Sequence, residues 1–185
     1  LVICPASLKT NWLRELERWL TRPMTVAVAN GETPDADVVI TNYEQLHKLP
    51  VAPADLLVVD EAHYLKNPKA KRTKLVGKFG KFAKRRVLMT GSPILNRPIE
   101  LHSLLDMLDP DAWPFWPYAQ TYCAAFKSRW GWDFTGASNL GDLQRKLRST
   151  LMVRRLKADV LAELPAKRRQ IVPLSPKAYS AVLKA

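Results

Sequence analysis

The stretch Leu56-Leu57-Val58-Val59-Asp60-Glu61-Ala62-His63 decides which fold we expect for this chain. Its four consecutive apolar residues predict a strand buried on both faces, as in the middle of a parallel sheet. Asp60 and Glu61 follow at the carboxyl end of that strand, where such a pair can hold Mg²⁺ and activate a water for nucleotide hydrolysis. A buried strand that merely ends in an acidic turn would give the same pattern. The apolar run before the carboxylates and the Ala62-His63 pair after them favour the nucleotide interpretation.

Length and charge limit the class of protein. The 185 residues are enough for one domain with a full core, or for one and a half small domains. The composition, 47% hydrophobic and 25% charged, is ordinary for a globular protein. The net charge of +12 suggests a polyanionic partner, most simply nucleic acid, although a basic solubility surface is the alternative.

Cysteine usage and hydropathy indicate the compartment. Cys4 and Cys123 lie far apart without a CxxC pair, which argues against a disulfide framework and against a structural zinc site. This usage fits a reducing, intracellular location. No apolar run approaches the length of a membrane span, so we expect no membrane partner. The chain opens directly with an apolar strand pattern at residues 1–4, and we therefore expect it to be a segment of a longer protein.

Strand and helix patterns alternate through the first 108 residues. Strands are predicted at residues 1–4, 25–29, 38–40, 56–59 and 86–89, and helices at residues 8–20, 69–79 and 98–108. This alternation predicts an α/β fold with a mostly parallel sheet covered on both faces. Ligands of such sheets bind at the carboxyl ends of the strands.

Small polar residues follow several of these strands. Ser7 is predicted to cap the first helix, and with Lys9 and Thr10 it could offer donors to a phosphate at that helix N-terminus. Thr41-Asn42 follow the strand at 38–40. Thr90-Gly91-Ser92-Pro93 follow the strand at 86–89 and form a turn that glycine and proline would fix.

The composition changes after residue 108. Residues 109–141 are rich in aromatic side chains and show no strand alternation, so we interpret residues 109–150 as a helical, aromatic-rich appendage with its own small core. Lys127 and Arg129 are interleaved with these aromatics. Stacking on nucleobases is therefore an alternative use for the rings, but packing is the interpretation that we favour. A dense basic stretch, 152–157, comes next.

Five motifs in the same order as in a known family extend over nearly the whole chain: Pro5-Ala6-Ser7-Leu8 with Asn11-Trp12, Ile40-Thr41-Asn42-Tyr43-Glu44, Asp60-Glu61-Ala62-His63 with Leu65-Lys66-Asn67, Leu88-Met89-Thr90-Gly91-Ser92-Pro93-Ile94 with Asn96, and Arg154-Arg155-Leu156-Lys157-Ala158-Asp159-Val160. The chain resembles the SWI/SNF-type branch of the superfamily-two helicase-like ATPases. Its aromatic segment, with Tyr122-Cys123, Trp130-Gly131-Trp132-Asp133 and Gly136-Ala137-Ser138-Asn139-Leu140, is similar to the annealing-helicase (HARP-like) branch.

The resemblance implies a RecA-like P-loop NTPase lobe that uses ATP and Mg²⁺. Residues 1–108 would form most of the first lobe, without its phosphate-binding loop. Residues 109–150 would be an insertion, and residues 151–185 a brace segment and linker toward a second RecA-like lobe of the same protein. The implied partner is double-stranded or forked DNA. The implied location is the nucleus in a eukaryote, or the cytoplasm and nucleoid if the source is prokaryotic or viral.

The resemblance also implies roles for individual residues. Asp60 would hold Mg²⁺ and Glu61 would be the general base. The residues that would couple nucleotide state to the second lobe are His63, Thr90, Gly91, Ser92, Arg154 and Arg155. Those that would contact the DNA backbone are Pro5, Ser7, Lys9, Thr41 and Asn42. Two positions depart from the family pattern: Ser92 keeps the hydroxyl of the more usual Thr, whereas Leu95 replaces a frequent Gln and puts a polar contact there in doubt.

The phosphate-binding loop is missing from these 185 residues. Gly77-Lys78 and Gly80-Lys81 are each followed by Phe rather than by the hydroxyl residue that a Gly-x-x-x-x-Gly-Lys-Thr/Ser loop requires. In the family that the chain resembles, this loop precedes the first strand, and the arginine fingers belong to the second lobe. An arginine finger alone can be worth about a thousandfold in rate. We therefore expect no measurable DNA-dependent ATPase activity from the 185 residues alone.

Three functions fit these patterns. The first is an ATP-dependent double-stranded DNA translocase that remodels or reanneals DNA. The second is a non-catalytic module that binds DNA or a partner on a RecA-like scaffold. The third is an RNA helicase or a restriction-translocase subunit with the same core. The intact Asp60-Glu61 pair argues against the second, and the Thr90–Pro93 turn with Arg154-Arg155 favours the first over the third.

Overall fold

The computed structural model describes residues 1–94 and 96–155. The chain divides into two units, Leu1–Gln144 and Arg145–Ala185, each of which is described by itself. Leu95 and residues 156–185, which include most of the expected brace segment, lie outside the described residues. The domain boundaries expected at residues 108 and 150 stay predictions.

A five-stranded parallel sheet forms the framework of the first unit. Its strands run in the order β2-β3-β1-β4-β5, and every neighbouring pair is parallel. The strands are β1 (Val2–Cys4), β2 (Val26–Val28), β3 (Val38–Asn42), β4 (Ala54–Val59) and β5 (Ala83–Leu88). The predicted α/β class and the mostly parallel sheet are confirmed. Because all strands run the same way, their carboxyl ends and the polar residues that follow them share one edge.

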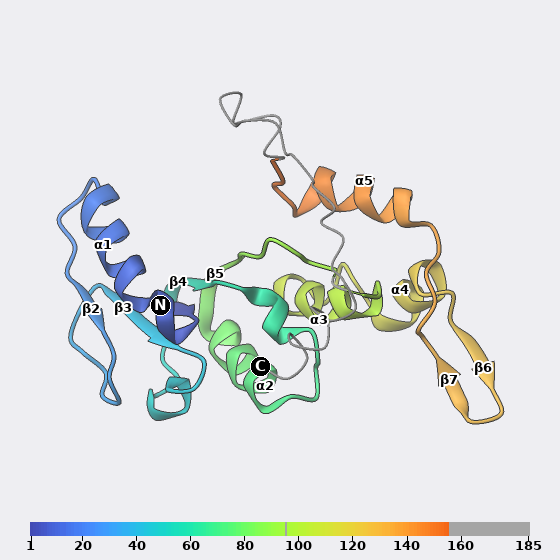
Figure 1. The fold of residues 1–185 in the computed structure, drawn as a ribbon, viewed down its shortest axis with the longest axis horizontal. Coiled ribbons are helices and arrows are strands. Elements are labelled where there is room, and N and C mark those ends of the chain that lie inside the picture. The colour runs from blue at the N-terminus through green and yellow to red at the C-terminus, as the bar shows by residue number, and fades with distance from the viewer. Residues whose placement is uncertain (95, 156–185) are drawn as a thin grey trace, which may run out of the picture. The chain divides into compact units, whose positions relative to one another are not determined.

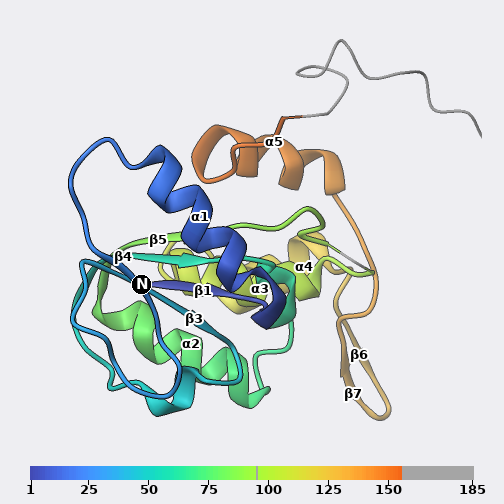
Figure 2. The ribbon, with the colours of Figure 1, turned by 60° about the vertical axis from the view of Figure 1, so that its left-hand side comes forward.

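Helices cover both faces of the sheet. Helix α1 (Lys9–Trp19) contacts β2 and β3 and lies on one face, whereas α2 (Lys71–Phe82) contacts β4 and β5 and lies on the opposite face (Figure 2). Helix α3 (Ile99–Leu108) packs against β5. Short 3₁₀ helices complete the connections: η1 (Ala6–Leu8), η2 (Leu46–Lys48) and η3 (Ala62–Leu65).

The core on the α1 side is built on β1 and β3. Val2, Cys4 and Ile40 are buried there, and the apolar stripe of α1, including Trp12, packs against them. The expectation that β4 is buried on both faces is wrong at its first apolar residue, because Leu56 is 41% exposed. Helix α1 lies over β2 and β3, and the start of β4 is therefore open on that face.

The start of α1 differs from the prediction. Ser7 lies inside η1 and does not cap the helix; the N-cap position of α1 is Leu8, which makes no side-chain hydrogen bond. The Leu8 amide already donates to the carbonyl of Pro5 at 2.9 Å. The 3₁₀ turn satisfies this amide without a side-chain cap.

The aromatic segment is helical only in part. It contains α4 (Phe115–Tyr122) and then an antiparallel hairpin, β6 (Phe126–Ser128) and β7 (Gly131–Asp133), before α5 (Leu140–Thr150) begins (Figure 1). The expected absence of strands is therefore wrong for residues 126–133. Strands of three residues are too short to show an alternation in sequence. Within the described residues, no helix has the length and apolar character needed to cross a membrane.

Candidate functional site

Asp60 lies directly after β4 and is held by hydrogen bonds from three parts of the first unit. Its Oδ1 accepts the amide of Glu61 at 2.9 Å, and its Oδ2 accepts the indole Nε1–H of Trp12, on α1, at 2.9 Å. Its carbonyl oxygen accepts the hydroxyl of Tyr43 at 2.5 Å, and its amide donates to the carbonyl of Ile3 at 2.8 Å. The carboxylate orientation is therefore determined by Trp12 on α1 and by the Glu61 amide, whereas Tyr43 and Ile3 hold the Asp60 backbone.

Tyr43 is a buried donor beneath the site. Burial raises the pKa of its hydroxyl well above the ordinary value, and the negative charge of Asp60 raises it further. The hydroxyl therefore stays protonated and continues to donate to the Asp60 carbonyl. The ring meets Tyr64 edge-on with 5.7 Å between ring centroids, which links the turn after β3 to the segment after β4.

Glu61 has a backbone conformation that is unusual for a residue with a side chain. Its φ of 50° and ψ of 45° are in the left-handed region. This conformation costs on the order of 1 kcal/mol for a non-glycine residue and is enriched at functional sites. The Glu61 side chain is 40% exposed, and its Oε2 lies 3.1 Å from Nδ1 of His63. The sharp turn thus presents a second carboxylate beside Asp60, partly open to solvent.

His63 connects the end of β4 with the end of β5. Its Nδ1 lies 3.2 Å from Oγ1 of Thr90, and the same hydroxyl oxygen accepts the amide of Ser92 at 3.1 Å. The backbone adds a further bond, because the Ala62 amide donates to the carbonyl of Met89 at 2.8 Å. Glu61, His63, Thr90 and Ser92 are therefore joined in one chain of contacts, and the structure brings these predicted site residues together.

Gly91, between Thr90 and Ser92, is exposed, and a side chain added there would meet no atom within 4 Å. Local packing therefore gives no reason for a glycine at this position.

The residues predicted to contact DNA fall into two groups. Ser7 is exposed, Pro5 is partly exposed, and Lys9 donates from Nζ to Oδ1 of Asn30 at 3.3 Å. Thr41 and Asn42, in contrast, are buried, with exposures of 0% and 5%. Their Oγ1 and Oδ1 atoms have no hydrogen-bond partner among the described residues, whereas Asn42 Nδ2 donates to Oε2 of Glu44 at 2.6 Å.

Arg154 and Arg155 belong to the second unit. Both are exposed and follow α5 in a stretch without regular secondary structure. Their place relative to Asp60 and Glu61 stays a prediction.

The Asp60 carboxylate is suited to hold a Mg²⁺ ion that is bound together with a nucleotide. Each carboxylate oxygen accepts one hydrogen bond, so each keeps a second lone pair, and the residue is partly exposed. Mg²⁺ in phosphate-transfer sites is held by one or two carboxylates, waters and the phosphates themselves. Residues 1–94 and 96–155 contain no cluster of three His, Cys, Asp or Glu side chains that could hold an ion without such help.

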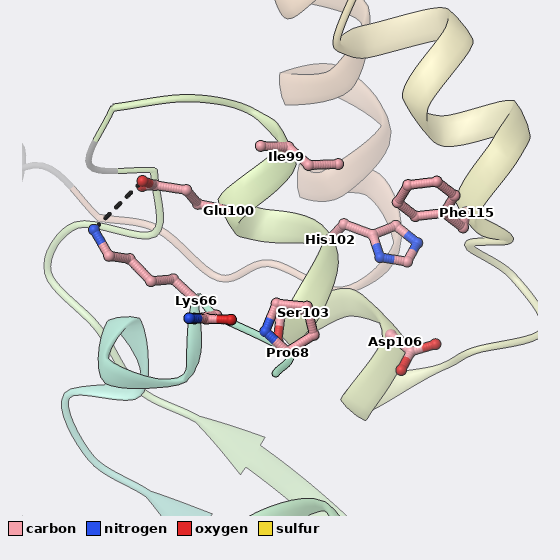
Figure 3. A pocket seen from close by; sticks show the side chains of 9 residues that line it. Lys66, Pro68, Ile99, Glu100, His102, Ser103, Asp106 and Phe115 are labelled. Atoms are coloured by element: carbon pink, nitrogen blue, oxygen red, sulfur yellow. Dashed lines mark hydrogen bonds and ion pairs between the residues drawn. The ribbon is translucent and has the colours of Figure 1, made fainter. Parts of the chain in front are cut away.

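A hollow of about 440 Å³ lies beside this edge, between the loop after η3 and the start of α3 and α4. Figure 3 shows Lys66 and Glu100 at its rim, where Lys66 Nζ lies 3.3 Å from Oε1 of Glu100, and His102 and Phe115 on its wall. Glu100 also accepts the amide of Asn96 at 3.2 Å. None of the predicted site residues lines this hollow.

Sequence reasoning missed the contributions of Trp12 and Tyr43 to this site, and it missed the Lys66–Glu100 pair at the hollow. The sequence places Trp12 in the first motif and in the predicted helix at residues 8–20, without indicating a bond to Asp60. A partly buried indole N–H usually finds an acceptor, so the position of Trp12 on the sheet-facing side was a usable signal. No comparable signal relates Lys66 to Glu100, because the pairing depends on where α3 packs.

Several known proteins are similar to this chain in sequence. The sequence model of the SNF2-related domain matches residues 1–182. The SWI/SNF-related matrix-associated actin-dependent regulator of chromatin subfamily A-like protein 1 of Xenopus tropicalis is 36% identical over 194 residues, covering 100% of this chain and 21% of the relative. The mouse DNA annealing helicase and endonuclease ZRANB3 is 36% identical over 193 residues, covering 94% of this chain and 18% of the relative.

A solved structure shows the same fold. The Sulfolobus solfataricus SWI2/SNF2 ATPase core in complex with dsDNA matches with a TM-score of 0.66 and 27% identity, over 85% of this chain and 34% of that one. The chain spans about a fifth of the length of the curated relatives it matches. Its match to the family over nearly all of its residues, together with the resemblance to these relatives, shows that the chain belongs to the SNF2-related domain family.

Proposed function

We propose that the complete protein is an ATP-dependent double-stranded DNA translocase that remodels or reanneals DNA, and that this chain forms part of its motor. The observation that carries the proposal is the chain of contacts from Glu61 through His63 to Thr90 and Ser92, with Asp60 alongside. It connects a carboxylate pair suited to nucleotide hydrolysis with a turn at the end of the neighbouring strand. A SWI2/SNF2 ATPase core bound to dsDNA and a DNA annealing helicase are among the similar proteins.

In this proposal the two carboxylates have different roles. Asp60, held in place by Trp12 and by the Glu61 amide, holds Mg²⁺ directly or through a water. The ion, when bound, neutralises charge on the nucleotide phosphates. Glu61 accepts a proton from the attacking water, and its exposed position beside Asp60 leaves room for that water.

The coupling residues and the DNA-contact residues lie at the same sheet edge. His63, Thr90, Gly91 and Ser92 respond to the state of Glu61 through their contacts and pass it to a second RecA-like lobe, where Arg154 and Arg155 would brace the two. Pro5, Ser7 and Lys9 contact the DNA backbone in this proposal. Thr41 and Asn42 can do so only if their side chains become exposed, because both are buried here. We propose that the protein acts in the nucleus of a eukaryote, or in the cytoplasm and nucleoid otherwise.

The test compares two variants of the complete protein. Glu61→Gln keeps the size of the side chain and removes the base, so ATP binding is expected to persist while duplex-stimulated ATPase activity falls by about a thousandfold. Asp60→Asn is expected to weaken Mg²⁺-ATP binding itself. Wild-type protein without DNA-stimulated hydrolysis would overturn the proposal in favour of a non-catalytic module, and stimulation by RNA instead of duplex DNA would favour an RNA helicase.

A further inference from the structure

The β6–β7 hairpin carries one tryptophan whose side chain projects into solvent. Trp130 is 86% exposed, whereas the aromatic residues at the base of the same segment, such as Trp113 and Tyr118, are each 3% exposed. Single exposed apolar side chains are common on protein surfaces, and the turn and the charges around Trp130 distinguish it from them. Trp116 and Trp132, each 46% exposed, and Phe126, at 56%, lie between these extremes, so Trp130 is the most open aromatic ring of the described segment.

The hairpin turn is built to hold this ring at its tip. Arg129 and Trp130 form a two-residue turn between the paired residues Ser128 and Gly131. Ser128 Oγ accepts the Trp130 amide at 3.2 Å and donates to the Gly131 carbonyl at 2.8 Å. Gly131 has a φ of 117°, which a residue with a side chain would adopt only with strain. Two neighbours, Ser128 and Gly131, therefore specify the turn that displays Trp130.

The base of the hairpin is rigidly attached. Trp132 meets Trp116 of α4 edge-on at 5.0 Å and lies parallel to Phe134 at 6.4 Å between ring centroids. Below these rings, Gly136 lies so close to residues 123 and 124 that an added Cβ would be 2.9 Å from the Cβ of Ala124. Figure 1 shows the hairpin projecting from the end of α4. The hairpin that carries Trp130 is thus anchored at its base, which lowers the loop entropy that would be lost when Trp130 binds a ligand.

The charges around Trp130 match a polyanion. The guanidinium of Arg129 lies 5.0 Å from the centre of the Trp130 ring, and Lys127 occupies the strand just before the turn. The nearby carboxylate, Asp133, is at the far end of β7 and accepts the amide of Thr135 at 2.7 Å. A ring with a cation against it and open surface remaining is the arrangement that binds nucleobases by stacking, with the cations near the phosphates.

We propose that Trp130 stacks on an unpaired nucleobase of DNA at the junction of single and double strands, with Arg129 and Lys127 contacting the adjacent phosphates. Bases inside a duplex are already stacked on one another, so an exposed ring finds a partner only where the strands separate. This inference rests on the proposed function for its choice of DNA, and it adds a specific substrate feature, the unpaired base, and the residue that recognises it.

The experiment measures the affinity of the complete protein for a blunt duplex and for a fork with unpaired arms, by fluorescence anisotropy. Trp130→Ala is expected to weaken fork binding by about tenfold and to leave blunt-duplex binding unchanged. Trp130→Phe, which keeps an aromatic face, is expected to retain most of the affinity. Arg129→Gln should reduce the steepness of the plot of log affinity for the fork against log salt concentration by about one, the equivalent of one released counterion.

A matched control is available on α1. Trp19 is also exposed, at 67%, and also has an arginine, Arg18, 5.1 Å from its ring centre, so Trp19→Ala removes a similar side chain elsewhere. It is expected to leave fork binding unchanged. A fork with abasic nucleotides at the junction should weaken wild-type binding as much as Trp130→Ala does, and should cost the Trp130→Ala variant nothing further.

Three outcomes would overturn the inference: equal losses on fork and blunt duplex, no loss on either DNA, or the same loss with Trp19→Ala. The outcome that overturns the proposed function is different. Absence of duplex-stimulated ATPase activity in the wild-type protein would refute the motor, whatever Trp130 does. Normal stimulation together with unaltered fork binding by Trp130→Ala would refute only the role of the hairpin.

Discussion

The indole Nε1–H of Trp12 donates to Oδ2 of Asp60 at 2.9 Å, which joins helix α1 to the carboxylate at the end of β4. The residues that we propose to contact DNA, Pro5, Ser7 and Lys9, lie at the start of the same helix or in the turn before it. A displacement of α1 by DNA would therefore act on the Asp60 carboxylate through this one bond.

Replacing Trp12 by Phe should raise the Mg²⁺ concentration needed for half-maximal ATPase activity of the complete protein by about fivefold. The substitution keeps an aromatic ring but removes a hydrogen bond to a charged acceptor, worth about 1 kcal/mol in a partly exposed position. A Mg²⁺ titration of initial rates measures the effect. Trp19→Phe is the matched control, because Trp19 Nε1 also donates to a carboxylate, Oε2 of Glu15, at 2.9 Å. An equal shift in both variants would contradict a specific role for Trp12.

Replacing Thr90 by Val should reduce DNA-stimulated ATPase turnover by about tenfold with little change in the KM for ATP. Valine cannot accept the Ser92 amide or contact Nδ1 of His63, so the link between the ends of β4 and β5 is lost. Thr90→Ser, which keeps the hydroxyl, should restore most of the turnover. His63→Ala combined with Thr90→Val should cost little more than either change alone, and additive losses would show that the two residues act independently.

Replacing Glu100 by Gln should make the free energy of unfolding depend less on pH in the acid range. Burial alone would raise the pKa of Glu100, but hydrogen bonds from the Asn96 amide and from Lys66 outweigh it, and the net pKa lies below the ordinary 4.5. A carboxyl with a lowered folded-state pKa stabilises the fold above pH 4.5, and this contribution is lost as the pH falls through the folded-state value.

Urea unfolding between pH 3 and pH 7 tests this expectation. The wild-type protein should exceed Glu100→Gln in unfolding free energy by about 1 kcal/mol near pH 7, and the difference should vanish at the acid end. Lys66→Met should give an intermediate result, because it leaves the bonds from Asn96 in place. A difference that does not change with pH would exclude an ionised Glu100 as its source.

Neither cysteine should react with iodoacetamide in the folded protein at pH 8. Cys4 and Cys123 have no exposed surface, and burial raises the pKa of each thiol to about 11. The thiolate is the reactive form, so both access and ionisation oppose alkylation. Mass spectrometry of the peptides that contain Cys4 and Cys123 should show no adduct on either residue under native conditions and one on each in denaturant. Rapid native labelling of Cys4 would mean that β1 opens readily.

The sheet was predictable because its signals are local. Strands such as β3 and β4 are short apolar runs that end in polar residues, and the stripe on α1 has helical spacing. The alternation of the two also predicted that Asp60 and Thr90 would meet at one edge, since the carboxyl ends of parallel strands lie together.

The remaining features depend on tertiary packing or on very short elements. Leu56 has the composition of a core residue, and only the position of α1 leaves it exposed. Thr41 and Asn42 were expected to follow their strand as ligand-binding residues do, but they are the last two residues of β3 and are buried. The hairpin around Trp130 has strands of three residues, which are too short to recognise in the sequence. The turn residues Arg129-Trp130-Gly131 were the feature that could have indicated a hairpin.

Strand β1 also determines when the sheet can form during synthesis. Val2 pairs with Ile40 on one side and with Val58 on the other, so both partners are made after it. At ribosomal rates of about 5–20 residues per second, the 56 residues from Val2 to Val58 take roughly 3–11 s. The apolar β1 segment has no neighbouring strand until β3 is made and lacks its second neighbour for the whole of that time, so its apolar residues wait longer for their partners than those of any other strand of this sheet.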